Sequence, residues 1–261
     1  MMMLGLSSRS APDAPLEELL TICARRGFVA LEVEEGHAHG LDSRRNPLDP
    51  VAAARRGEEA GIRITGYRTS VGVDSEHEHP DMHAHAEIGD SRLGRLGKAL
   101  GATIVLDGPA RIGPRLDLAS ALQRAGVRAA VVVEGEGCLD EAAEATARGL
   151  DIVWDADPGL GGLGPLGALL LERHADRLHS IRLLGGGPET ATHEGSGLGE
   201  LMGHLALARY AGTVIVSPSS TLYRVAWRTW LGRRGGSGCA GTQPGDPLVD
   251  LPGPAAQAGS G

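Results

Sequence analysis

The chain has 261 residues, 41% of them hydrophobic and 22% charged, and its formal net charge is −8 at pH 7. This hydrophobic content excludes a wholly disordered chain, because it is enough to bury a core. The negative charge argues against binding to nucleic acid, whose phosphate backbone is usually met by a basic face. The longest apolar runs, such as Ala129 to Val133, are far shorter than the ~18 residues that a membrane span needs, so we expect no membrane partner.

The amino-terminal segment, Met1 to Leu6, lacks a basic region followed by a long apolar region and a small-residue cleavage site. It therefore does not have the pattern of a signal peptide, and we expect a cytoplasmic protein. The three cysteines of the chain include no CxxC pair, which argues against a zinc site built from thiolates.

Along the first 231 residues, short apolar runs rich in β-branched residues alternate with longer segments of helical periodicity. This alternation predicts a parallel sheet covered by helices, and eight repeats favour a closed (β/α)8 TIM barrel over an open sheet. The expected strands are 3–6, 28–33, 62–67, 103–106, 129–133, 152–154, 179–183 and 213–216. The expected helices are 15–26, 50–60, 88–100, 118–125, 139–148, 166–173, 198–210 and 221–231. Glycines at positions 27, 61, 101, 126 and 149 stand where a helix must end.

The last thirty residues have a different composition, with nine Gly and four Pro and almost no periodic apolar pattern. Such a segment cannot bury enough apolar surface to fold by itself. We therefore predict one barrel domain over residues 1–231 and a disordered Gly/Pro-rich tail over residues 232–261.

Polar residues stand where the apolar runs end. In a barrel of this type the active site is built at the carboxyl ends of the strands, so these residues are the candidates for function. From strand two to strand eight they are Glu32, Glu34 and Glu35; Arg68 and Thr69; Asp107; Glu134 and Glu136; Asp155 and Asp157; Arg182; and Ser217, Ser219 and Ser220. Taken one at a time they could be solvated loop starts, but the pattern across several strands indicates a site.

Several segments resemble the xylose-isomerase-like barrel superfamily, which includes sugar phosphate isomerases and epimerases. The resemblance covers roughly residues 3–218 and lies in the order and spacing of short segments rather than in one strict signature. These segments are Leu31 to Val33, Val131 to Glu134, Ile152 to Asp155 followed by Pro158-Gly159, Arg177 to Arg182, Gly195 to Gly197, and Tyr210 to Val216.

The resemblance implies a divalent metal held by a Glu, an Asp, a His and a Glu from strands five to eight. Carried over to this sequence, Glu134 and Asp155 match the first two ligands, whereas the His position falls on Arg182 and the last Glu position on Ser217. A guanidinium cannot coordinate a metal and does not lose its charge, so Arg182 between Glu134 and Asp155 could neutralise the pocket in place of the ion. A metal in a rearranged shell, with ligands from Glu134 and Asp155, stays open as the alternative. The cofactor prediction is therefore none or a divalent metal ion.

Two other groups of residues are candidates for binding. Arg182, with Gly185 and Gly186 after strand seven and Ser217, Ser219 and Ser220 before the last helix, stands where such barrels often bind phosphate. Equally, glycines are common in this chain and a serine is needed to cap the helix. His37 and His39 after strand two, with Glu32 or Glu34, are placed for proton transfer, although each could also be a lone surface histidine. Four histidines between His77 and His85 could bind a metal or belong to a solvated loop.

The resemblance implies an isomerase, epimerase or dehydratase that acts on a small carbohydrate or hydroxy-carbonyl compound. In that role Glu134 or a histidine removes a proton beside a carbonyl, and Arg182 stabilises the enolate-like oxygen next to Asp155. The substrate is then a small anionic or polyhydroxylated molecule. The alternative is a non-catalytic barrel that binds a small anion or serves as a partner subunit; the sequence leaves homo-oligomerisation open.

Overall fold

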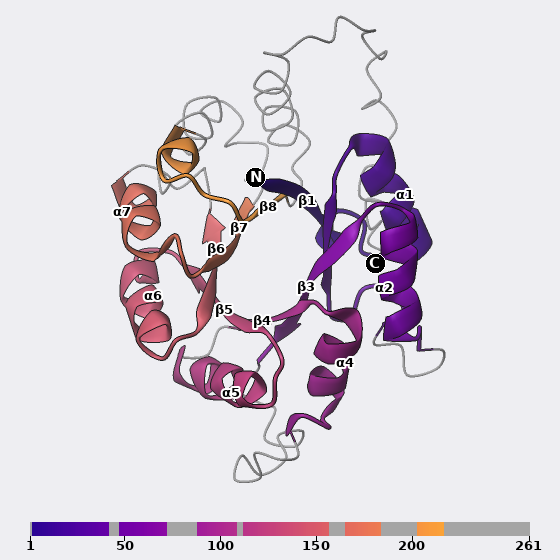
Figure 1. Cartoon of the computed structure of the whole chain (residues 1–261), viewed down its shortest axis with the longest axis horizontal. Coiled ribbons are helices and arrows are strands. Elements are labelled where there is room, and N and C mark those ends of the chain that lie inside the picture. Colours follow the sequence, from indigo (N-terminus) through magenta and orange to yellow (C-terminus); the bar gives the residue numbers. More distant parts are fainter. Residues whose placement is uncertain are drawn as a thin grey trace, which may run out of the picture.

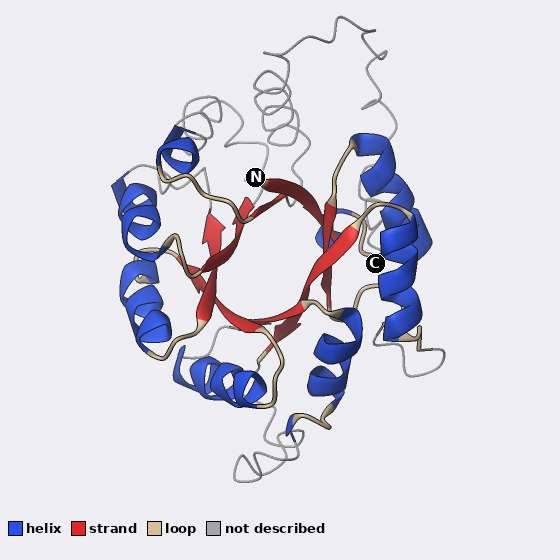
Figure 2. Cartoon of the chain, in the orientation of Figure 1, coloured by secondary structure: helices blue, strands red, loops and turns tan. Residues whose placement is uncertain are grey.

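The computed structural model describes residues 2–41, 47–71, 88–108, 112–156, 165–183 and 203–216. In these residues the strands form a closed ring, and the helices lie around its outside (Figures 1 and 2). No helix in the described ranges has the length and apolar character to cross a membrane. The predicted (β/α)8 barrel is confirmed.

All eight strands are parallel and follow one another around the barrel in chain order. The ring closes where β1 pairs with β8. All eight predicted strands are present, with ends that differ by a few residues. The strands are β1 (Met3–Ser7), β2 (Ala30–Glu34), β3 (Arg63–Ser70), β4 (Thr103–Asp107), β5 (Ala129–Glu134), β6 (Asp151–Ala156), β7 (Leu178–Leu183) and β8 (Thr213–Val216).

The helices are η1 (Ser8–Ser10), α1 (Leu16–Arg26), α2 (Pro50–Glu59), α4 (Arg92–Leu100), α5 (Ile112–Arg124), α6 (Cys138–Ala147) and α7 (Pro165–His174), with further helical residues at 203–207. Two starts differ from the prediction by more than one residue. Helix α4 begins later, because the Ser91 side chain accepts a hydrogen bond from the Gly94 amide and caps it. Helix α5 begins earlier, because Pro114 is tolerated in a first turn. The predicted helix 221–231 and the tail 232–261 lie outside the described residues.

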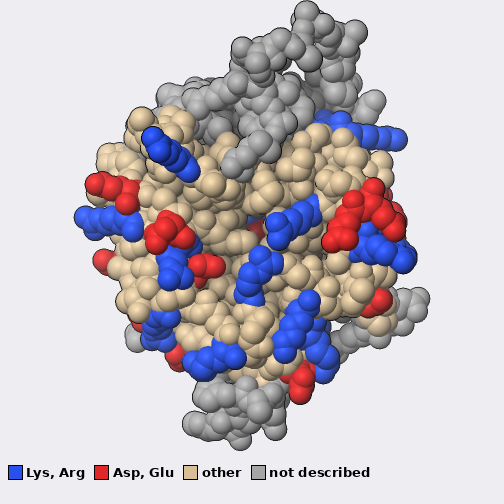
Figure 3. Space-filling model, viewed as in Figure 1, with Lys and Arg blue, Asp and Glu red and all other residues tan. Residues whose placement is uncertain are grey.

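The turns that lead from helices into strands are fixed by glycines and arginines. Gly27 and Gly101 end α1 and α4 with φ angles of 71° and 60°, in the left-handed region that favours glycine. The guanidinium of Arg128 donates to the carbonyl of Gly101, and Nη1 of Arg177 donates to the carbonyl of Gly149 at 3.1 Å. Lys and Arg side chains lie around the centre of the face at which the strands begin (Figure 3). The helices end at this face, so these positive charges oppose the negative ends of the helix dipoles.

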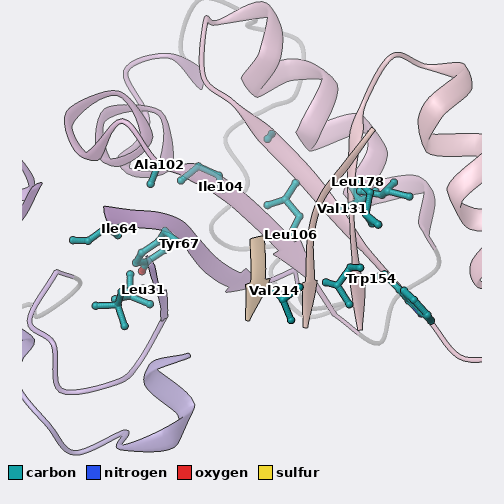
Figure 4. Packing of buried hydrophobic residues seen from close by; sticks show 14 of the residues in the cluster. Leu31, Ile64, Tyr67, Ala102, Ile104, Leu106, Val131, Trp154, Leu178 and Val214 are labelled. Atoms are coloured by element: carbon teal, nitrogen blue, oxygen red, sulfur yellow. The ribbon is translucent and has the colours of Figure 1, made fainter. Parts of the chain in front are cut away.

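The apolar core has two parts. The larger part lies between the strands and the surrounding helices, and Figure 4 shows some of its members. The smaller part is a cluster of Val105, Ala130, Val132 and Val153 on β4, β5 and β6. Because neighbouring residues of a strand point to opposite faces, these four side chains fill the barrel interior below its carboxyl-terminal mouth.

Candidate functional site

A largely buried network of charged side chains lies directly above this inner cluster. It consists of Glu32 on β2, Arg68 on β3, Asp107 on β4, Asp155 on β6 and Arg182 on β7, and we call it the mouth network. Arg182 is 0% exposed and Glu32, Arg68 and Asp155 are at most 4% exposed. Charged groups are rarely buried unless they are paired, so the pairing decides what this site can do.

Arg68 forms the centre of the mouth network. Its Nη1 and Nη2 atoms donate to Oδ1 and Oδ2 of Asp155 at 3.1 Å and 2.8 Å. Its Nε and Nη2 atoms also donate to Oδ2 of Asp107, at 3.0 Å and 2.5 Å. The planar guanidinium thus holds two carboxylates from non-adjacent strands, β4 and β6, in a fixed geometry.

Arg182 contacts three carboxylates. Its Nη2 donates to Oε1 of Glu32, and the same atom lies 3.7 Å from Oε2 of Glu34. Its Nε lies 4.0 Å from Oδ1 of Asp155. Nε and Nη1 of Arg182 form no hydrogen bond within the described residues. The charge of Arg182 is therefore neutralised, while part of its donor capacity is unused.

A glycine on β3 makes room for the Glu32 carboxylate. A Cβ atom at Gly66 would lie 3.1 Å from Cγ of Glu32 and 3.3 Å from its Oε2. The register between β2 and β3 also shifts between Leu31 and Glu32, which places Glu32 opposite Gly66. Glu32 can then reach Arg182, which is 150 positions away in sequence.

The rim of the mouth carries more exposed ion pairs. Arg9 donates from Nη2 and Nε to the two carboxylate oxygens of Glu34, at 2.7 Å and 3.1 Å. Burial raises the pKa of Glu34, but the hydrogen bond and charge of Arg9, with the charges of Arg182 and Arg68, hold that pKa below its ordinary value. Glu34 is therefore ionised at neutral pH and is a weak base.

The pKa of Asp107 is also held below its ordinary value. Its burial raises its pKa, but the charge and hydrogen bonds of Arg68, together with the Gly108 amide, outweigh burial and lower the pKa. Asp107 and Glu34 are thus suited to holding charge in place rather than to removing a proton from a substrate.

The structure brings two of the three predicted catalytic residues together. Asp155 and Arg182 lie in the mouth network, whereas Glu134 is exposed at the end of β5 and forms no hydrogen bond or ion pair with another described residue. The expected placement of Arg182 between Glu134 and Asp155 is therefore wrong. The reason is that the Glu32 side chain lies next to Gly66 and forms the ion pair with Arg182 that was expected of Glu134.

The candidates for proton transfer after strand two contact other groups. Glu32 bonds Arg182, whereas Nδ1 of His37 lies 2.8 Å from Oγ of Ser8. His39 has a structural role, because it bonds the Glu34 carbonyl at 2.7 Å and accepts from the Leu41 amide at 3.2 Å. The remaining binding candidates fall outside the described residues, and they are Gly185, Gly186, Ser217, Ser219, Ser220 and the histidines between His77 and His85.

Arg68 and Asp107 are strand ends in the sequence, but their positions there do not show that Arg68 is the shared partner of Asp107 and Asp155. One signal was available. Arg68 follows Gly66 by two positions, and a glycine on the same strand face as an arginine indicates a crowded barrel interior.

Solved structures with this architecture are numerous, although no protein-family model and no curated protein matches the sequence. D-psicose 3-epimerase from Clostridium cellulolyticum H10 is 15% identical, with a TM-score of 0.57 over 89% of this chain and 98% of that one. A 3-keto-D-glucoside 4-epimerase from E. coli is 14% identical, with a TM-score of 0.58 over 90% and 99%. The chain shares the fold of the sugar epimerase barrels. A probable 3-DHS dehydratase from Bacillus anthracis has the same epimerase-barrel fold, at 10% identity and a TM-score of 0.58 over 89% and 100%.

Within this sugar epimerase fold, the described residues do not fit the divalent metal that the resemblance implies. Both oxygens of Asp155 accept hydrogen bonds from Arg68, and the positive charge of Arg182 lies on the other side of the carboxylate. Glu134 takes no part in this arrangement. Among the described residues, no group of three or more His, Cys, Asp and Glu side chains could hold a metal ion. Two guanidinium groups at Asp155 repel a cation, so no catalytic step is assigned to one here.

Proposed function

We propose that this chain is a sugar isomerase- or epimerase-like enzyme that moves a proton beside the carbonyl of a small carbohydrate or hydroxy-carbonyl compound. The observation that carries the proposal is the position of Glu134 at the carboxyl end of β5. Val131 and Val133 belong to the outer core and Ala130 and Val132 to the inner cluster, so alternation gives Glu134 the inward direction. Solved barrels of the same fold support the proposal, since their names describe epimerases and a dehydratase.

Glu134 is the carboxylate at the mouth that is suited to act as a general base. The neighbouring carboxylates are paired with arginines, whereas Glu134 has no such partner among the described residues. A base must be free to accept a proton, and the pairing that lowers the pKa of Glu34 and Asp107 makes those two poor acceptors. Register pairing places Glu134 beside Asp155, at the edge of the mouth network.

Arg182 would stabilise the oxygen that becomes negative when the proton leaves. Its Nε and Nη1 hydrogens are not used by the described residues, and fixed donors in a water-poor site are effective for such charge. Arg68 and Asp155 would keep Arg182 in place. Glu134 would take the proton from carbon, and the C–H electron pair would pass into the enolate that Arg182 stabilises. Return of the proton from Glu134 to the neighbouring carbon gives the isomer, and delivery of a proton by water to the opposite face gives the epimer. None of these steps draws on a metal ion.

The proposal is tested by hydrogen exchange in D2O. The purified protein is treated with EDTA and incubated with unphosphorylated and phosphorylated ketoses, including D-psicose and L-ribulose, and NMR follows deuterium entry beside the carbonyl. We expect exchange with at least one of these sugars and its loss in Glu134→Gln. The matched control is Glu136→Gln, an exposed glutamate two positions away that should leave the exchange rate unchanged.

Three other results would contradict the proposal. If exchange persists in Glu134→Gln, Glu134 is not the base. If EDTA abolishes the exchange, the reaction depends on a metal ion. Stabilisation of the fold by a sugar or an anion without any exchange favours the non-catalytic binding protein.

A further inference from the structure

We infer that Arg68 is a positioning residue whose guanidinium occupies the point at which a metal ion would bind. Arg68 holds Asp107 and Asp155 in the arrangement of metal ligands. Its removal therefore creates a divalent-metal site. This inference rests on the contacts of Arg68 alone and does not depend on the proposed reaction.

The carboxylate oxygens around Arg68 converge on one atom. Nη2 of Arg68 lies 2.5 Å from Oδ2 of Asp107 and 2.8 Å from Oδ2 of Asp155. Oxygens at roughly 2.3–2.6 Å are what a cation such as Ca²⁺ takes, so a nitrogen occupies a point that two carboxylates already surround at nearly the ligand distance. The second oxygen of Asp155 bonds the neighbouring Nη1, at 3.1 Å.

The surrounding charge favours a cation at this point. Burial alone would lower the pKa of Arg68, but the charge and hydrogen bonds of Asp155 and the charges of Asp107 and Glu32 raise it above its ordinary value. A third carboxylate therefore contributes to the potential at Arg68. An arginine here stays charged at every pH at which the fold exists, and unlike a metal it cannot be extracted by a chelator.

Arg182 does not have this geometry. One carboxylate, that of Glu32, lies within hydrogen-bond distance of its Nη2, and the next oxygen, from Glu34, is 3.7 Å away. Of the two arginines of the mouth network, Arg68 is therefore the one with the ligand-like convergence. The inference differs in this respect from the sequence-based expectation, which gave the role of the cation to Arg182.

The test is a titration with Mn²⁺, followed by the EPR signal of the free ion. The unchanged chain should show no stoichiometric binding at the mouth. Arg68→Ala should bind one Mn²⁺ per chain at least ~10-fold more tightly, with a rise in melting temperature, because a bound ligand stabilises the folded state. Asp107→Asn in the Arg68→Ala background should abolish the gain, and so should Asp155→Asn.

A matched control uses another arginine of the rim. Arg92 is half-exposed and bonds Glu35, so Arg92→Ala removes the same charge without opening converging carboxylates and should gain no Mn²⁺ binding. Arg68→Lys keeps a cation in place and should fold without gaining metal.

Several outcomes would overturn the inference. If Arg68→Ala folds but binds Mn²⁺ no better than the Arg92→Ala control, Arg68 does not occupy a cation site. If Arg68→Ala is unfolded by itself, Mn²⁺ must restore its circular dichroism spectrum, and failure to do so has the same meaning. Stoichiometric Mn²⁺ binding by the unchanged chain that Asp155→Asn abolishes would show that Arg68 does not exclude the metal.

Discussion

Replacing Arg182 with methionine tests the pairing of the mouth network most directly. Arg182 is fully buried and contacts three carboxylates, so the change leaves charge behind in the interior. Methionine has a similar length and fills much of the same space, so the loss of packing is small. The result then reports the electrostatics.

The structure sets the magnitude through the partners that remain. Asp155 keeps its two hydrogen bonds to Arg68, and Glu34 keeps Arg9. Glu32 is the carboxylate left without its ion-pair partner, and it is 2% exposed. Stranding one buried charge costs about 3–5 kcal/mol, so Arg182→Met should lower the free energy of unfolding by roughly that amount.

A double-mutant cycle followed by urea unfolding measures the effect. Adding Glu32→Gln removes the stranded charge, so the double variant should be more stable than Arg182→Met, with a coupling energy of about 1–3 kcal/mol. Glu134→Gln is the control. It should add to Arg182→Met within about 0.5 kcal/mol, because Glu134 does not contact the arginine. Equal coupling of Glu134 and Glu32 to Arg182 would refute the pairing described above.

Two further outcomes follow from the pKa shifts and from the helix packing. The lowered pKa values of Glu34 and Asp107 mean that these groups stabilise the fold above the ordinary carboxyl pKa and lose that contribution as the pH falls through the lowered values. The urea midpoint should therefore decline below about pH 4–5, and Arg9→Gln should make the decline shallower, whereas an unchanged slope would contradict the Arg9–Glu34 pair. Gly167→Ala should destabilise by about 1–3 kcal/mol, because its Cβ would lie 2.5 Å from Cη2 of the buried Trp154 ring. Its control, Gly113→Ala in α5, meets nothing within 4 Å and should stabilise by about 0.5–1 kcal/mol, as seen by thermal unfolding.

The barrel could be predicted from the sequence because each of its units repeats the same local signals. Apolar runs such as Ala129 to Val133 are too short for buried helices, and glycines at positions such as 27 and 101 stop the helices between them. These signals act over a few residues, so one sequence is enough to read them. The helix starts at Arg92 and Ile112 were harder to predict, because they depend on a serine cap and on a proline in a first turn.

The pairings of the mouth could not be predicted in the same way. Alternation shows that Glu32, Arg68 and Arg182 face inward, but it does not show which carboxylate meets which arginine across the barrel. That choice depends on the register shift beside Glu32 and on the space left by Gly66. Neither feature leaves a periodic signal in the sequence, which therefore favours Glu134 instead of Glu32 as the partner of Arg182.

The mouth network also bears on the order in which the fold is assembled and lost. Arg182 and Glu32 are separated by 150 positions, and Arg68 and Asp155 by 87, so we expect these contacts to form late in folding, because long loops must close before they can form. Interactions that are absent from the transition state leave the folding rate unchanged and slow unfolding instead. We therefore expect the mouth network to lengthen the lifetime of the native state without speeding its formation.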